Sequence, residues 1–199
     1  MKYTVVDGHC DTPMELWLRQ ENLRSNTCQV SLEQAKKLSG YVQFYAFCTV
    51  WLEQDGSFEA HYAAALEHFN RQLDENKDQI VRCKNEADAR AAIGSGKCGA
   101  FLSIEGAEAI SCDPGKLELA CAQGVRMIAP AWNAQNALTG SCMTGGGLTA
   151  QGKEFVRRAQ KLGMILDVSH ISEKAFWDLC DITEKPFVAS HSNSRAICK

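Results

Sequence analysis

The sequence lacks the features that would place it in a membrane or on nucleic acid. It contains no run of about 18 apolar residues, so no transmembrane helix is expected. No apolar signal-peptide region precedes the first strand-like run, and we therefore expect a cytoplasmic protein. Neither sign of charge dominates, since 21 Lys and Arg face 24 Asp and Glu, for a net charge of −3. This balance favours neither nucleic acid nor an anionic membrane as a partner.

Several short motifs are also missing. Ten cysteines occur without a Cys-x-x-Cys pair, which argues against a zinc finger or a thioredoxin-like redox motif. We expect free thiols, several of them behaving as small buried hydrophobic side chains. The glycine run 145–147 lacks the Lys and Ser or Thr of a phosphate-binding loop, so it is interpreted as structural. We find no fixed-period repeat and no low-complexity tract.

What remains has the composition of one soluble globular domain covering residues 1–199. Apolar residues make up 45% of the chain and charged residues 23%, and the length is sufficient for a substantial hydrophobic core. Short apolar runs alternate with helical patterns, which indicates β/α units and a parallel sheet. The pattern predicts strands at 3–6, 41–51, 100–104, 126–131, 164–168 and 187–190, and helices at 13–19, 59–76, 85–94, 117–123, 149–162 and 172–180.

Side chains that bind metals follow four of the predicted strands. His9 and Asp11 come after the first, and residues i and i+2 of extended backbone point to the same side. Glu105, His170 and His191 each follow a later strand. In a closed parallel β/α barrel these strand ends meet at one mouth, where such enzymes keep their chemistry. Histidines with carboxylates suit zinc, and two divalent ions that share a carboxylate suit amide hydrolysis.

Each of these residues also has a simpler interpretation. A His-x-Asp is by itself more often a hydrogen-bonded loop pair, and a glutamate after a strand often begins a helix. Each single histidine is more often a hydrogen-bonded structural residue than a ligand. The joint pattern changes this balance, because three of the five histidines lie at strand ends beside carboxylates. The other two, His61 and His68, lie seven residues apart on a predicted helix, and we assign them no function.

Seven segments of the sequence resemble the renal-type, or membrane, dipeptidase family of zinc metallopeptidases, within the metal-dependent amidohydrolase superfamily. They occur in the family's order over nearly the whole chain. The segments are VVDGHCDTP at 5–13, GYVQF at 40–44, SIEGA at 103–107, GVRMI at 124–128, GLTAQG at 147–152, LDVSHIS at 166–172 with FWD at 176–178, and ASHSNSRA at 189–196.

The resemblance implies a TIM-type (β/α)8 barrel with a binuclear zinc centre. By motif, His9 and Asp11 hold one zinc, Glu105 bridges both ions as the catalytic carboxylate, and His170 and His191 hold the other. The implied reaction is hydrolysis of a dipeptide to two amino acids by a metal-bridging hydroxide, with the peptide carbonyl polarised by zinc.

The motifs identify the residues around these proposed ligands less directly. Asp167 and Ser169 are candidates, by their proximity in sequence alone, for orienting the imidazoles. Mammalian members place a substrate-polarising histidine where this sequence has Trp132, followed by Asn133, as in the bacterial branch of the family. We therefore assign Trp132 and Asn133 to substrate binding, with Asn133 a weak candidate for polarising the carbonyl.

Chains of this family are much longer than this one, which ends just after the His191 motif. The last two β/α units are expected to be absent, together with the family's substrate-carboxylate arginine and acid/base aspartate. We therefore expect an incomplete barrel of about six β/α units. Its first and sixth strands would be exposed edges that invite a homodimer.

Three hypotheses on function remain open. The first is a zinc dipeptidase, and the second is a related metal-dependent amide or lactam hydrolase. The third is a truncated, non-catalytic metal-binding remnant, or a domain that acts only with a partner chain.

Overall fold

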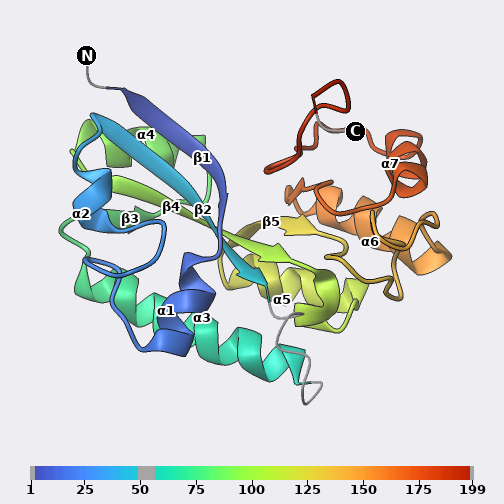
Figure 1. The fold of residues 1–199 in the computed structure, drawn as a ribbon, viewed down its shortest axis with the longest axis horizontal. Helices are drawn as coiled ribbons and strands as arrows, with labels where there is room; N and C mark the ends of the chain where they lie inside the picture. The colour runs from blue at the N-terminus through green and yellow to red at the C-terminus, as the bar shows by residue number, and fades with distance from the viewer. Residues whose placement is uncertain (1–2, 49–56, 198–199) are drawn as a thin grey trace.

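A single parallel sheet organises the protein in the computed structural model, which describes residues 3–48 and 57–197 (Figure 1). Within those ranges the sheet has six strands. They are β1 (Thr4–Cys10), β2 (Gly40–Cys48), β3 (Ile80–Arg82), β4 (Cys98–Glu105), β5 (Val125–Ala129) and β6 (Ile165–Leu166).

The strand order is β1-β2-β4-β5-β6, and every named pairing is parallel. Strand β4 is the centre of the sheet, and it pairs with β2 on one side from Gly99 to Glu105. On its other side β3 pairs with the beginning of β4, from Cys98 to Ala100, and β5 pairs with its end, from Leu102 to Glu105. Because the strands are parallel, the carboxyl ends of β1, β4 and β6 face the same way.

Helices connect the strands, and polar side chains fix where several of them begin. Asn85 accepts a hydrogen bond from the Asp88 amide, and Ser172 accepts one from the Ala175 amide, which satisfies amides that have no partner inside the helix. The helices are α1 (Thr12–Arg19), α2 (Leu32–Ala35), α3 (Phe58–Glu75), α4 (Glu86–Gly94), α5 (Leu117–Ala122), α6 (Ala150–Lys161) and α7 (Glu173–Cys180), with 3-10 turns at Ala107–Ile110 and Pro114–Lys116.

The two faces of the sheet have different partners. Tyr45 and Phe47 of β2 point to the face covered by α1 and α3, where both rings contact Phe69 within the main core. Val42 and Phe101 point to the other face and pack against α4 in a smaller cluster. Side chains alternate along a strand, so Glu105, four residues after Phe101, lies on this second face.

The predicted helices agree with the structure to within a few residues, whereas the strands differ more. The strand predicted at 3–6 continues to Cys10, so His9 lies within β1 and not after it. The strand predicted at 41–51 is β2, and residues 49–51 lie outside the described ranges. The strand predicted at 126–131 ends earlier, at Ala129. Strand β3 was missed, because its three residues give too short an apolar pattern.

Two strand predictions near the carboxyl end were wrong in extent. The run 164–168 forms strand only at Ile165–Leu166, and 187–190 forms a single bridge between Val188 and Asp167. The cause is the side chain of Asp167, which accepts hydrogen bonds from the amides of Ser169 and Ser190 at 3.0 and 3.1 Å. Those amides are therefore not available to a continuing strand ladder.

The curled parallel sheet with covering helices is part of a TIM-type barrel. Cys10, Cys83, Cys98 and Cys112 are buried thiols without disulfides, as expected. Within the described ranges, no helix has the length and apolar character needed to cross a membrane. Of the two unassigned histidines, His68 is buried on α3, and its Nε2 lies 3.3 Å from the Glu21 carbonyl oxygen.

Candidate metal centre

Five sequence-predicted ligands come from four separated parts of the chain. His9 lies at the end of β1, where the register with β2 shifts between Asp7 and Cys10. Asp11 is the residue before α1, and its backbone is not extended, so the simple i, i+2 argument does not describe it. Glu105 is the last residue of β4. His170 follows β6 with a φ of 73°, and His191 lies in the carboxyl-terminal segment.

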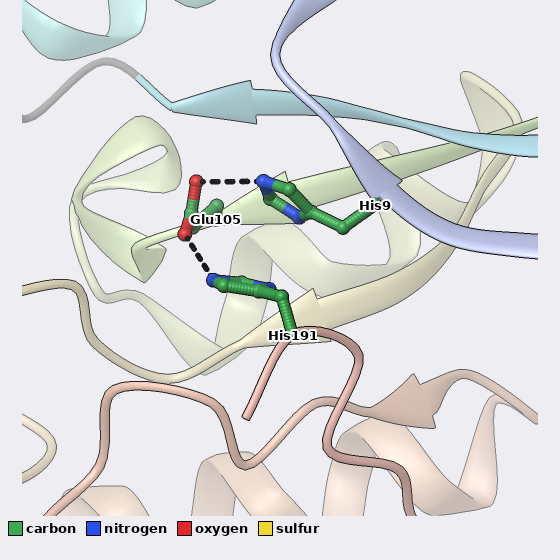
Figure 2. Close-up of side chains that lie close together, drawn as sticks. All are labelled: His9, Glu105 and His191. Carbon is green, nitrogen blue, oxygen red and sulfur yellow. Dashed lines mark ion pairs between the residues drawn. The ribbon is translucent and has the colours of Figure 1, made fainter. Parts of the chain in front are cut away.

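Glu105 is at the centre of this group, with its two oxygens facing different partners. Its Oε2 lies 3.5 Å from His9 Nε2. Its Oε1 lies 2.7 Å from His170 Nε2 and 3.2 Å from His191 Nε2. Figure 2 shows the carboxylate between His9 and His191, which approach it from β1 and from the carboxyl-terminal segment. The geometry divides the site into two halves that share one carboxylate.

Asp11 belongs to the half that contains His9. One of its carboxylate oxygens lies 3.5 Å from His9 Nε2, the same atom that faces Glu105. The side chain of Asp11 is 49% exposed, whereas that of Glu105 is 6% exposed. The group therefore runs from a buried carboxylate outward to a solvent-accessible one.

The other half brings two imidazole nitrogens together. The Nε2 atoms of His170 and His191 are 2.7 Å apart, and both are near Glu105 Oε1. His9, Glu105 and His191 also offer ligand atoms that lie within 4.8 Å of one another. Imidazole nitrogens and a carboxylate gathered in this way suit a divalent cation such as zinc. The residues present therefore fit the metal centre that the sequence implies.

The carboxylates and histidines of this group shift one another's pKa. Burial acts to raise the pKa of Glu105, but hydrogen bonds from His170 and His191 and the charge of His9 hold this pKa well below its usual range. Burial acts to lower the pKa of His9, but the hydrogen bond to Asp11 and the charge of Glu105 raise it above its ordinary value. Glu105 is thus anionic although buried, and its surroundings favour positive charge.

Asn133 contacts the ligand group directly. Its side-chain oxygen lies 3.0 Å from His170 Nδ1, the ring atom that faces away from Glu105. An amide oxygen can only accept, so His170 Nδ1 carries a proton there, and Nε2 is the ring nitrogen that faces Glu105 and would bind a cation. The indole of Trp132 lies 6.3 Å, centroid to centroid, from the His170 ring. Both residues predicted to bind substrate are therefore beside His170.

Asp167 and Ser169, the sequence candidates for orienting the imidazoles, lie beside His191 and its neighbour Ser190. Ser169 accepts a hydrogen bond from the His191 amide at 3.2 Å. Asp167 is buried and contacts Ser190, whose Oγ lies 2.7 Å from His191 Nδ1. Sequence reasoning missed Ser190, although its position immediately before His191 was a signal that could have found it.

Comparison with known proteins identifies the family of the chain. The sequence profile of the membrane dipeptidase family, peptidase family M19, matches residues 1–199. A dipeptidase of Claviceps purpurea, tcpJ, is 29% identical over 155 residues, which is 73% of this chain and 36% of that protein. An uncharacterised protein of Acinetobacter calcoaceticus is 38% identical over 135 residues, which is 64% of this chain and 43% of that protein.

Solved structures show the same fold. An M19 metallopeptidase described as dipeptidase AC superposes with a TM-score of 0.86 at 25% identity, covering 99% of this chain and 65% of its own. A metallopeptidase of Rhodobacter sphaeroides, liganded with a phosphinate mimic of the dipeptide L-Ala-D-Ala, gives a TM-score of 0.83 at 24% identity, covering 99% and 67%.

The chain spans less than half the length of the curated relatives just named. The profile match nevertheless runs over every residue of the chain, and the structural matches cover nearly all of it. The chain belongs to the membrane dipeptidase family, peptidase family M19.

Proposed function

We propose that this chain carries the metal centre of a zinc-dependent dipeptidase, which hydrolyses the peptide bond of a dipeptide. The observation that carries the proposal is Glu105, whose Oε2 faces His9 and whose Oε1 faces His170 and His191. Two cations can share one carboxylate when each of its oxygens faces a separate set of ligands. Membership of the family and the dipeptidases among the relatives support the same reaction.

Each residue has a defined part in this proposal. His9 and Asp11 would hold one zinc ion, His170 and His191 the other, and Glu105 both. When bound, the two cations supply Lewis-acid polarisation of the peptide carbonyl and lower the pKa of water. Burial of Glu105 excludes water from its bridging oxygens, and Asn133 orients His170.

Substrate contacts are proposed at both halves of the site. Trp132 and Asn133 border His170 and would meet the substrate there. A cavity of about 500 Å³ borders His9 and Asp11, a volume suited to a small ligand. We also propose that the chain forms a homodimer through β1, the end strand of the sheet path among the described strands.

The test combines metal analysis with a peptidase assay. The purified chain is loaded with zinc, its zinc content is measured, and a panel of L,L- and L,D-dipeptides is assayed by release of free amino acids. We expect about two zinc ions per chain and hydrolysis of members of the panel. Bound zinc without turnover would instead favour the non-catalytic remnant, and turnover of other amides or lactams alone would favour the related hydrolase. A chain that binds no zinc would refute the proposal.

A further inference from the structure

A chain of hydrogen bonds connects the buried carboxylate of Asp167 to the ring of His191. Ser190 donates its hydroxyl proton to Asp167 Oδ2, and Ser190 Oγ lies 2.7 Å from His191 Nδ1. The other oxygen of Asp167 accepts the amides of Ser169 and Ser190 at 3.0 and 3.1 Å. Asp167 is only 3% exposed, so these three donors account for its buried charge.

The direction of each proton follows from the type of group. A carboxylate can only accept hydrogen bonds, so the single proton of Ser190 points to Asp167. Ser190 Oγ then has only lone pairs left for His191, and His191 Nδ1 must be the donor. His191 Nε2, which lies 3.2 Å from Glu105 Oε1 and hydrogen-bonds to it in the metal-free chain, is consequently the nitrogen that offers a lone pair once a cation replaces its proton.

We propose that Asp167 is a positioning residue that acts through Ser190 to keep a proton on His191 Nδ1, which presents Nε2 to the metal centre. This inference rests on the proposed function, because the orientation matters only if a cation binds there. Ser169 completes the arrangement, since its Oγ accepts the His191 amide at 3.2 Å and fixes the backbone as well as the ring.

His170 also has its Nδ1 at a hydrogen-bond acceptor, which is an amide oxygen instead of a hydroxyl. His170 Nδ1 faces the acceptor oxygen of Asn133 at 3.0 Å, and its Nε2 faces Glu105 Oε1. Two histidines from different segments thus have their Nδ1 atoms at acceptors and their Nε2 atoms 2.7 Å apart. Such outer hydrogen bonds raise the basicity of a ligating imidazole and are worth roughly 10–100-fold in metal affinity.

Two variants distinguish the hydrogen-bonded chain Asp167–Ser190–His191, hereafter the relay, from a general structural role of these residues. Ser190→Ala removes the hydroxyl. Asp167→Asn keeps size and shape, but its oxygen is needed by the two backbone amides, which leaves its NH2 group facing Ser190. Ser190 must then turn its proton toward His191 Nδ1, which moves the imidazole proton to Nε2. The matched controls are Ser194→Ala and Asp181→Asn, which change an exposed hydroxyl and an exposed carboxylate of the same region.

The experiment uses the full chain with 15N-labelled histidine. NMR measures whether His191 Nδ1 carries a proton, and chelator competition measures zinc affinity. In the native chain and both controls we expect a protonated Nδ1, with and without zinc. In both variants we expect loss of the protected Nδ1 proton and a roughly 10–100-fold weaker zinc affinity.

The result can contradict the relay and the proposed function separately. An unprotonated His191 Nδ1 in the zinc-free native chain would overturn the relay even if the chain binds zinc, and this measurement needs no variant. Folded variants with the native Nδ1 signal would overturn it too. If Nδ1 responds as expected but the native chain binds no zinc, the relay stands and the metal centre does not.

Discussion

At the scale of single residues, Glu105 is the centre of the proposed metal site. Its two oxygens face ligands that come from opposite ends of the chain, and it is nearly inaccessible to solvent. A buried carboxylate that stays anionic needs positive charge around it. In the metal-free chain the charge of His9 and hydrogen bonds from His170 and His191 offset the burial of this carboxylate, and in the loaded chain the cations would do so.

The first prediction concerns Glu105→Gln. The amide keeps the volume but loses the negative charge and one of the two acceptor oxygens, so both cation sites should weaken. We expect zinc affinity to fall by roughly 100-fold or more, because even groups that merely orient a ligand are worth about 10–100-fold. Glu154→Gln, an exposed change on α6, is the matched control. Unchanged zinc content in Glu105→Gln would contradict the bridging role.

The second prediction concerns Asn133, whose oxygen meets His170 Nδ1. Asn133→Ala removes the acceptor and should lower zinc affinity roughly 10–100-fold, while Asn133→Asp keeps an acceptor and should remain close to the native chain. Chelator competition measures both. Equal affinities in the alanine and aspartate variants would assign Asn133 no role in orienting His170.

At the scale of elements, the sequence predicted the helices better than the strands. The apolar spacing of 59–76 and the caps at Asn85 and Ser172 are local signals, and α3, α4 and α7 confirm them. The strands near the carboxyl end depend on hydrogen bonds between distant residues. Asp167 takes amides that a strand ladder would use, and no local pattern reveals that competition.

The third prediction tests the cap of α4. Asn85 accepts the Asp88 amide at 2.9 Å, and α4 packs over Val42 and Phe101 on the face of the sheet that bears Glu105. Asn85→Ala should lower the free energy of unfolding by about 1 kcal/mol, measured by urea denaturation. Asn85→Asp retains an acceptor and should cost less. A loss as large in the aspartate variant would show that capping is not the cause.

At the scale of the whole molecule, the candidate site connects parts of the chain that the sheet alone connects weakly. The ligands belong to β1, β4, the end of β6 and the carboxyl-terminal segment, which joins β6 by one bridge at Val188. Bound cations would therefore fasten the last segment to the centre of the sheet.

The fourth prediction follows from this linkage. A ligand that binds only the folded state at 100 times its Kd adds about 2.7 kcal/mol of stability, and for a chain of this size 1 kcal/mol corresponds to about 2–4 °C in Tm. Removing zinc with a chelator should therefore lower Tm by about 5–10 °C. Thermal scans with and without zinc measure it, and Glu105→Gln should show little shift. An equal shift in that variant would assign the stabilising zinc to another site.

The fifth prediction concerns the end strand β1. Val6 is 66% exposed and Tyr3 is 64% exposed beside its edge, and exposed edge strands tend to pair with other chains. We expect the chain to self-associate as concentration rises, and Val6→Lys to weaken this association. Sedimentation velocity measures both. A native chain that stays a compact monomer at every concentration would contradict it.

The sequence by itself determined the class of the fold, most of the helices and the five residues predicted to bind metal. Composition, periodicity and caps are local signals. The motifs around His9, Glu105 and His191 are local too, and their residue types indicate metal binding. Only the tertiary structure decided that the two oxygens of Glu105 face different histidines, and that Asp167 reaches His191 through Ser190. Those contacts join residues that lie far apart in the sequence. They arise from the register of the strands and from competition for hydrogen bonds. No short stretch of sequence encodes either of these.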